Sequence, residues 1–173
     1  MPSVKFSEVR SLLGKHDLLL NNEGPPRDEE TEELRQALNA YFDGREAKYC
    51  VAGIDIYRYS DMPGVVQRLV PTLFQSIYDV ATGLCAEGEK FLFQKGPIKG
   101  RFVSTGDGGF QILESPLHAI AFAIFFELAL AAYNGFYVFP RLRQIVGALS
   151  VRYAITYDTL FEQDGNFFGA AII

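Results

Sequence analysis

Residues 49–57 read Tyr-Cys-Val-Ala-Gly-Ile-Asp-Ile-Tyr, an apolar run whose only carboxylate is Asp55. Valine, isoleucine and tyrosine favour extended backbone, so the run predicts a buried β-strand that ends at Asp55. The next residues, 60–63, are Ser-Asp-Met-Pro, which supply a helix cap and a proline for a first helical turn. We therefore expect this strand to lead into a long helix over residues 64–85.

A second aspartate lies in a hairpin signal further along the chain. Residues 101–105 and 109–113 have strand-like composition, and Gly106-Asp107-Gly108 stands between them as a turn. Alone, this is an ordinary hairpin turn, and Asp55 alone is as consistent with a strand-end or capping carboxylate. Together, two aspartates at the ends of strands predict a site for divalent cations, because carboxylate oxygens bind such ions and paired ions suit chemistry at nucleotide phosphates.

The order of the other segments predicts an α+β fold. Residues 119–133 are the most apolar stretch, which we expect to be a buried core helix too short to cross a bilayer. Residues 139–149 predict another helix, and residues 150–157 alternate as a strand. We expect an N-terminal helical arm over residues 1–46 and one domain over residues 47–173, with a mostly antiparallel sheet and helices packed on one face. Smaller elements are expected at residues 90–94, as a short strand, and at residues 166–173, as a helix or loop.

Composition narrows the class of protein. A chain of 173 residues with 49% hydrophobic content predicts a globular protein, not a disordered one. The net charge of −5 and the lack of a dense basic stripe argue against a nucleic-acid partner. Cys50 and Cys85 stand in apolar surroundings and are expected to be buried free thiols. Residues 1–15 lack the apolar region of a signal peptide, so we expect a cytoplasmic protein with no membrane partner.

A phosphate-binding segment is expected directly after the first aspartate. Backbone N–H groups that precede a helix, together with the helix dipole, favour anions. We therefore expect a triphosphate to be cradled by four consecutive residues, Tyr57, Arg58, Tyr59 and Ser60.

These motifs resemble those of the class III nucleotidyl cyclases, the family of the adenylate and guanylate cyclase catalytic domains. The family's first metal motif reads Asp-Ile-x-Gly-Phe-Thr, and residues 55–60 match it with Arg58 in place of the glycine. Gly106-Asp107 matches the second metal motif. Residues 149–156 resemble the strand before the catalytic region, and residues 166–173 resemble the family's Asp-x-Trp-Gly-x-x-Val-Asn segment.

The resemblance, which runs from Tyr49 to Ile173, implies a ferredoxin-like class III cyclase fold. It implies an enzyme that converts a nucleoside triphosphate into a 3′,5′-cyclic monophosphate and pyrophosphate. Asp55 and Asp107, with the Ile56 carbonyl, would hold two Mn²⁺ or Mg²⁺ ions, one acting on the ribose 3′-hydroxyl and one on the phosphates. Because the family's sites lie at a head-to-tail interface, a head-to-tail homodimer is also implied.

The base-selecting positions differ from those of both well-known branches. Adenylate cyclases carry Lys where Val103 stands and Asp where Asn166 stands, and the Glu and Cys pair of guanylate cyclases is absent as well. An asparagine amide both donates and accepts hydrogen bonds, so Asn166 suits a pyrimidine edge. We expect Val103, Thr105 and Asn166 to bind the base.

The chain looks most like the pyrimidine cyclases of the bacterial Pycsar antiphage system in four runs: residues 53–60, 105–110, 152–156 and 169–173.

This narrower resemblance implies a product, cyclic UMP or cyclic CMP, that acts as a second messenger in antiphage defence. The family's transition-state Asn would fall at Ile173, and its Arg four residues later, so we expect a truncated, weakly active chain or a domain that lost this machinery. One alternative is a catalytically impaired module that binds nucleotide or regulates. A metal-dependent nucleotidyl-transfer palm of another family is a second. The two retained aspartates favour an enzyme, because a like-charge pair is costly to keep.

Overall fold

The computed structural model describes residues 4–15, 28–88 and 98–172. By packing, the chain forms two compact units, one of residues 49–158 and the other of residues 1–48 with 159–173. Because these units are defined by packing alone, the expected functional division of the chain at residue 46 stays a prediction.

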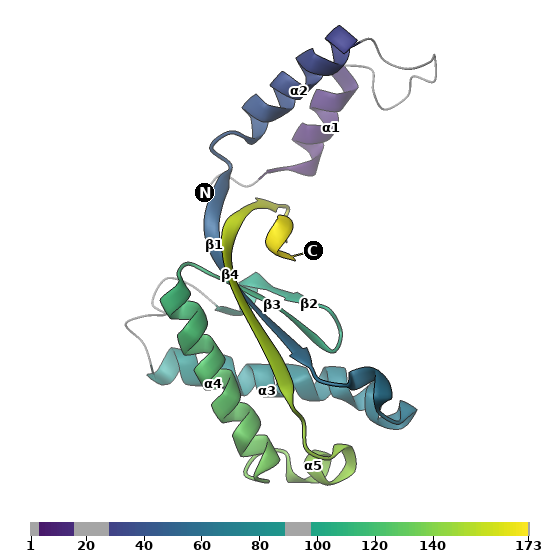
Figure 1. Ribbon diagram of the computed structural model, residues 1–173, viewed down its shortest axis with the longest axis vertical. Coiled ribbons are helices and arrows are strands. Elements are labelled where there is room, and N and C mark those ends of the chain that lie inside the picture. Colours follow the sequence, from purple (N-terminus) through teal and green to yellow (C-terminus); the bar gives the residue numbers. More distant parts are fainter. Residues whose placement is uncertain (1–3, 16–27, 89–97, 173) are drawn as a thin grey trace. The chain divides into compact units, whose positions relative to one another are not determined.

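The strands form a five-stranded antiparallel sheet in the order β2-β3-β1-β4-β5. Figure 1 labels the strands β1 to β4. β1 (Glu46–Ile56) pairs with β3 (Gly108–Leu113), and β3 pairs with β2 (Phe102–Ser104). β4 (Val151–Gln163) is the other neighbour of β1 and pairs with β5 (Asn166–Phe168). The α+β class, the antiparallel sheet and the hairpin expected around Asp107 are thereby confirmed.

Two long helices, α3 (Gly64–Gly88) and α4 (Pro116–Asn134), build the core of the unit of residues 49–158. Ala52, Ile54 and Ile56 of β1 belong to this core. Because side chains alternate along a strand, the intervening residues of β1 face away from it. The helices contribute most of the other buried core side chains: Val70, Leu73, Phe74, Ile77, Tyr78, Ala81, Phe122, Phe126 and Leu130.

α4 is longer than the sequence analysis predicted. Ser115 caps it by accepting a hydrogen bond from the amide of His118, and Pro116 occupies the first turn. Within the described residues it is the one helix long and apolar enough, by length and composition, to cross a membrane, so the argument that it is too short was wrong. Its buried residues pack into the core as those of a globular protein do, while Leu117, Ile120, Ile124 and Leu128 remain 51–58% exposed.

A buried polar network fixes the hairpin against α3. Gln111 of β3 is fully buried and accepts a hydrogen bond from the hydroxyl of Tyr78 at 2.7 Å. Its amide nitrogen donates to the carbonyl of Ile98 at 2.8 Å, in a 3₁₀ turn η2 (Ile98–Arg101). Every polar atom named here has a partner, so the network costs little to bury and sets the position of β3.

The second unit contains α1 (Phe6–Lys15) and α2 (Asp28–Phe42), which lie within the helical arm expected over residues 1–46. The Tyr41 hydroxyl of α2 donates to the Glu8 carboxylate of α1 at 2.7 Å. β5 corrects the expectation of a helix or loop over residues 166–173, because a strand comes first and a 3₁₀ turn, η3 (Ala170–Ile172), follows.

The reason for β5 is the turn that precedes it. Asp164 and Gly165 both have positive φ, +49° and +81°, as a two-residue hairpin turn of the Asp-Gly kind requires. The register pairs Gln163 with Asn166 and Phe161 with Phe168. The chain therefore folds back on β4 as a strand over residues 166–168, where a helix or loop was expected.

Two smaller expectations can be compared directly. Cys50 and Cys85 are buried and free, as predicted. A short helix α5 (Pro140–Val146) lies within the segment expected to be helical. The short strand expected at residues 90–94 falls outside the described residues.

Candidate functional site

The sheet brings the two aspartates of the predicted metal motifs together. β1 and β3 pair so that Asp55 lies opposite Gly108, the residue after Asp107. The amide of Ile56 donates to the carbonyl of Asp107 at 3.1 Å, which extends the pairing into the hairpin turn. Asp55 and Asp107 thus lie next to each other at the same end of neighbouring strands.

Glycines on both sides of Asp107 make this approach possible. Gly106 has φ +100°, a conformation that side-chain-bearing residues rarely adopt. A Cβ on Gly108 would clash with the carbonyl oxygen of Ile54 and come within 3.0 Å of the Cα of Asp55. Gly108 is therefore required by the close contact of two backbones and Gly106 by its positive φ, in addition to any role in binding.

Asp55 faces away from the helical core, since its neighbours Ile54 and Ile56 are buried in it. Its carboxylate forms an ion pair with Arg152 of β4, in which the guanidinium Nε donates to Oδ2 at 3.0 Å and Nη2 donates to the same oxygen. The side chains of Asp55 and Arg152 are 40% and 68% exposed. The hydrogen bond from Arg152 to Asp55, the charge of Asp55 and, more weakly, that of Asp107 raise the pKa of Arg152.

Hydrogen bonds from α4 hold the start of β4 in place. The side chain of Asn134, at the end of α4, donates to the carbonyl of Leu149 at 2.9 Å and accepts from the Leu149 amide at 3.0 Å. The next residue, Ser150, accepts a hydrogen bond from the amide of Tyr57 at 2.9 Å. Arg152 follows two residues later, so its position beside Asp55 depends on both contacts.

Alternation along β4 turns Arg152 to the open face. Tyr153 lies on the other side of the strand, where its hydroxyl donates to Glu127 of α4 at 2.9 Å and its ring contacts Phe126. Burial, followed by the hydrogen bond to Glu127, raises the pKa of Tyr153. With Tyr153 anchored to the helix, Arg152 points away from the helices, toward the face that carries Asp55.

The loop after β1 differs from the expected direct passage into a helix. A 3₁₀ turn, η1 (Tyr59–Asp61), comes first, and α3 begins only at Gly64, so neither Ser60 nor Asp61 caps it as predicted. Gln67 of α3 orders this loop by donating to the carbonyls of Tyr59 and Ser60 at 3.3 and 3.1 Å. Tyr57 is one of the four residues expected to bind a triphosphate, but its backbone amide already donates a hydrogen bond to the carbonyl of Ser150.

Arg58 occupies an unusual backbone conformation in this loop. Its φ of +59° and ψ of +32° are left-handed, a region in which glycine is favoured. Its guanidinium pairs with Asp61, three residues later, at 2.8 Å. The position that carries Arg58 thus has the backbone geometry of a glycine.

The residues expected to bind the base fall in different parts of the chain. Val103 pairs with Phe110, which in turn pairs with Gly53 of β1, so the three share a face of the sheet. Thr105 lies in the exposed hairpin turn, where its amide donates to the carbonyl of Gly108 at 3.1 Å. Asn166 lies in β5, in the unit of residues 1–48 and 159–173, and is exposed.

Arg152 is the site residue to which sequence reasoning assigned no role. It belongs to a run, residues 152–156, that was noted only for its resemblance to a family strand. A signal was present in the sequence, because Arg152 is the sole charged residue between Arg143 and Asp158. A lone cation on a strand next to an aspartate-bearing strand points to an ion pair across the sheet.

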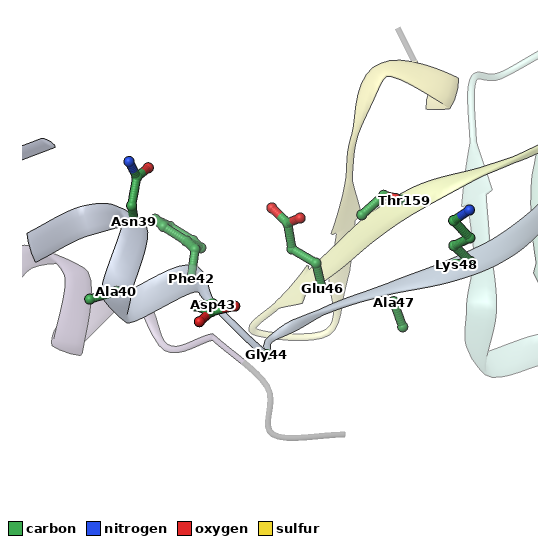
Figure 2. Close-up of a pocket in the computed structure, with 9 residues that line it drawn as sticks. All are labelled: Asn39, Ala40, Phe42, Asp43, Gly44, Glu46, Ala47, Lys48 and Thr159. Carbon is green, nitrogen blue, oxygen red and sulfur yellow. The ribbon is translucent and has the colours of Figure 1, made fainter. Parts of the chain in front are cut away.

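A cavity of about 670 Å³ lies elsewhere, in the unit that contains α2 (Figure 2). It is lined mainly by the end of α2 and the start of β1, with Asp43, Glu46 and Lys48 as its charged residues. None of the residues expected to bind metal, phosphate or base lines it. The aspartate pair therefore remains the candidate site.

Within residues 4–15, 28–88 and 98–172, no cluster of three or more His, Cys, Asp or Glu side chains could hold a metal ion. A cation at this site would need ligands from the two aspartates, the backbone and the substrate or water. The chain matches no protein-family model, no curated protein and no solved structure.

Proposed function

We propose that this chain is a metal-dependent nucleotidyl cyclase that converts a nucleoside triphosphate into a 3′,5′-cyclic monophosphate and pyrophosphate. The observation that carries the proposal is the strand register in which Asp55 lies opposite Gly108 and beside Asp107. The register places two acidic residues at adjacent backbone positions, and a divalent cation would neutralise their combined negative charge.

The donor set fits a hard divalent cation. Asp55, Asp107 and the Ile56 carbonyl offer oxygen ligands, which Mg²⁺ and Mn²⁺ prefer. The Asp55 carboxylate is partly exposed and already accepts a cationic group, the guanidinium of Arg152. Bound ions would lower the pKa of the ribose 3′-hydroxyl and neutralise charge on the phosphates. The chain's own part is to hold the carboxylates rigidly and to supply Arg58 and the amides of Arg58, Tyr59 and Ser60 to the triphosphate.

Topology is a second support for the resemblance to class III cyclases. The elements β1, α3, β2, β3, α4 and β4 follow one another in the sequence, and the sheet order is β2-β3-β1-β4. The same order of helices and strands is expected for the ferredoxin-like βαββαβ arrangement that the resemblance implies. The left-handed backbone of Arg58 is a third support, since the family has glycine at that position of its motif.

The enzyme is proposed to prefer a pyrimidine base, with UTP or CTP as its substrate. Its cyclic nucleotide product would act as a second messenger in antiphage defence. Val103 shares the face of Phe110 and Gly53, beside the strand that carries Asp55, and supplies no cation that would read a purine. Asn166 would contact the base across a head-to-tail homodimer interface, and the enzyme would work in the cytoplasm, where its substrate is found.

The test is a cyclisation assay on this chain with ATP, GTP, CTP and UTP supplied separately in the presence of Mn²⁺, with products identified by mass spectrometry. Cyclic UMP or cyclic CMP would support the full proposal, whereas cyclic AMP or cyclic GMP would support the enzyme and overturn the base preference. Asp55→Asn and Asp107→Asn are each expected to lower turnover at least about 100-fold, because each removes a charged ligand of the ions. Glu87→Gln, an exposed carboxylate near the far end of α3, is the matched control and should not change the rate.

A second candidate is a cyclase-like module that binds nucleotide without turning it over. The ion pair that occupies Asp55 favours this reading, because an aspartate engaged by an arginine is a poorer metal ligand. Nucleotide binding that requires Mn²⁺, with no product from any of the four triphosphates, would support the module and contradict the enzyme.

A further inference from the structure

The aspartate of the proposed metal site does not stand free in the structure. Arg152 donates two hydrogen bonds to one oxygen of Asp55, and the charge of Asp107 acts on the same guanidinium. One arginine thus neutralises part of the negative charge that two adjacent carboxylates create. This inference rests on the proposed metal site, and it concerns what controls entry to that site.

We propose that Arg152 is an internal counter-ion that competes with divalent cations for Asp55. Arg152 occupies lone pairs of Asp55 Oδ2 that a divalent ion would use, and its positive charge repels an ion at either carboxylate oxygen, so binding of the ion favours the departure of Arg152. The protein without metal then avoids the repulsion between Asp55 and Asp107, at the expense of affinity for the metal alone.

The surroundings of Arg152 allow it to leave. Its side chain is 68% exposed, so most of it is free to change rotamer in solvent. Its guanidinium also lies 5.8 Å from the centre of the half-exposed ring of Tyr57. A cation–π contact with this ring would stabilise Arg152 after it leaves Asp55. Tyr57 begins the segment proposed to hold the triphosphate, so displacement of Arg152 from Asp55 moves a positive charge toward the substrate's phosphates.

The backbone that carries Arg152, by contrast, is fixed. Asn134 holds Leu149 on both its amide and its carbonyl, and Ser150 is bonded to the amide of Tyr57. Only the side chain is therefore expected to move. The effect of Arg152 on the affinity for the metal can therefore be measured without any turnover.

The test measures Mn²⁺ binding to the protein without nucleotide, by the electron paramagnetic resonance signal of free Mn²⁺. Arg152→Gln is expected to bind Mn²⁺ at least about threefold more tightly than the wild type, because a competing positive charge is gone. Arg152→Lys keeps the charge and should stay within about twofold of the wild type. Arg68→Gln, an exposed arginine on α3, removes the same charge away from the aspartates and should leave the affinity unchanged.

The outcomes separate this inference from the proposed function. Unchanged affinity in Arg152→Gln, with Asp55→Asn weakening Mn²⁺ binding, would overturn the counter-ion and leave the metal site intact. Equal tightening in Arg68→Gln would also overturn it, by showing a general effect of charge. Mn²⁺ binding that is insensitive to Asp55→Asn in both the wild type and Arg152→Gln would overturn the metal site itself.

A second measurement needs no folded variant. In the wild-type chain, the Nε–H of Arg152 donates to Asp55, so its ¹⁵N-correlated NMR signal reports that hydrogen bond. Titration with diamagnetic Mg²⁺ is expected to move this signal together with the backbone amides of Asp55 and Asp107. Shifts of the two amides without a shift of the Arg152 signal would contradict displacement.

Discussion

Arg58 has an unfavourable backbone conformation in the loop after β1. Left-handed φ and ψ destabilise a residue with a side chain by about 1–2 kcal/mol. The ion pair between Arg58 and Asp61 is exposed on both side chains, so it contributes little stability. An arginine kept under these conditions is consistent with a use for its guanidinium, which we have proposed to be the triphosphate.

Replacement of Arg58 by glycine is therefore expected to stabilise the fold. Arg58→Gly relieves the left-handed conformation, and after the entropy that glycine adds to the unfolded chain we expect a gain of up to about 1 kcal/mol in the free energy of unfolding. Urea denaturation measures the change. Arg58→Ala is the control, because it loses the same ion pair but keeps a Cβ at positive φ, and it should bring no gain. A glycine variant less stable than the alanine variant would show that the strain argument is wrong.

At the scale of elements, the contact between β1 and β3 depends on Gly108. Its missing Cβ leaves room for the carbonyl of Ile54, and no flexible side chain nearby could move aside. Gly108→Ala is expected to lower the free energy of unfolding by about 1–3 kcal/mol, since the two strands would have to separate locally. Because Asp55 lies opposite Gly108, proposed turnover and Mn²⁺ binding should fall with it.

The control for this substitution is a glycine with open space around it. Gly83 lies inside α3 and has no atom within 4 Å of an added Cβ. Gly83→Ala should raise stability by about 0.5–1 kcal/mol, because alanine suits a helix interior better than glycine. Equal effects at both glycines, measured by urea denaturation, would argue against a steric role for Gly108.

The same elements show why sequence reasoning reached part of this fold. The apolar run of residues 49–57, the proline before α3 and the Gly-Asp-Gly turn are local signals, and β1, α3 and the hairpin of β2 and β3 formed close to where they were predicted. β5 was missed although Asp164-Gly165 is a hairpin signal, because the strand that follows, Asn166–Phe168, has only three residues and is too short to show a period-two pattern. Arg152 acquires its role only through the pairing of β1 with β4, a long-range contact that no local pattern specifies.

At the scale of the whole molecule, the negative net charge and the buried titratable groups both lower the free energy of unfolding as pH rises. The net charge is −5 at pH 7, and several buried groups resist losing a proton. Burial raises the pKa of the Cys85 thiol to about 12, and burial is also the first cause of the raised pKa of Tyr78. In the unfolded chain these groups titrate near their ordinary values of 9 and 10. Above pH 9, therefore, the unfolded chain releases protons that the folded chain retains.

Stability should accordingly be lost on the alkaline side. A group with a raised folded pKa contributes its full stability below its unfolded pKa and loses it as pH rises through the interval up to the folded pKa. For Cys85 this interval runs from 9 to about 12, so the free energy of unfolding should fall by roughly 1 kcal/mol between pH 8 and pH 10 from this thiol alone. Urea denaturation at the two pH values measures the fall.

Two variants on α3 separate titration from packing. Cys85→Ala leaves a cavity but removes the thiol, so its loss of stability between pH 8 and pH 10 should be smaller than that of the wild type by roughly 1 kcal/mol. Val70→Ala makes a cavity in the same helix without removing a titrating group, and should lower stability equally at both pH values. If Cys85→Ala kept the pH dependence of the wild type, the thiol would have to be ionisable within the fold. The packing of α3 against β1 would then be open to water at the place where it supports the strand that carries Asp55.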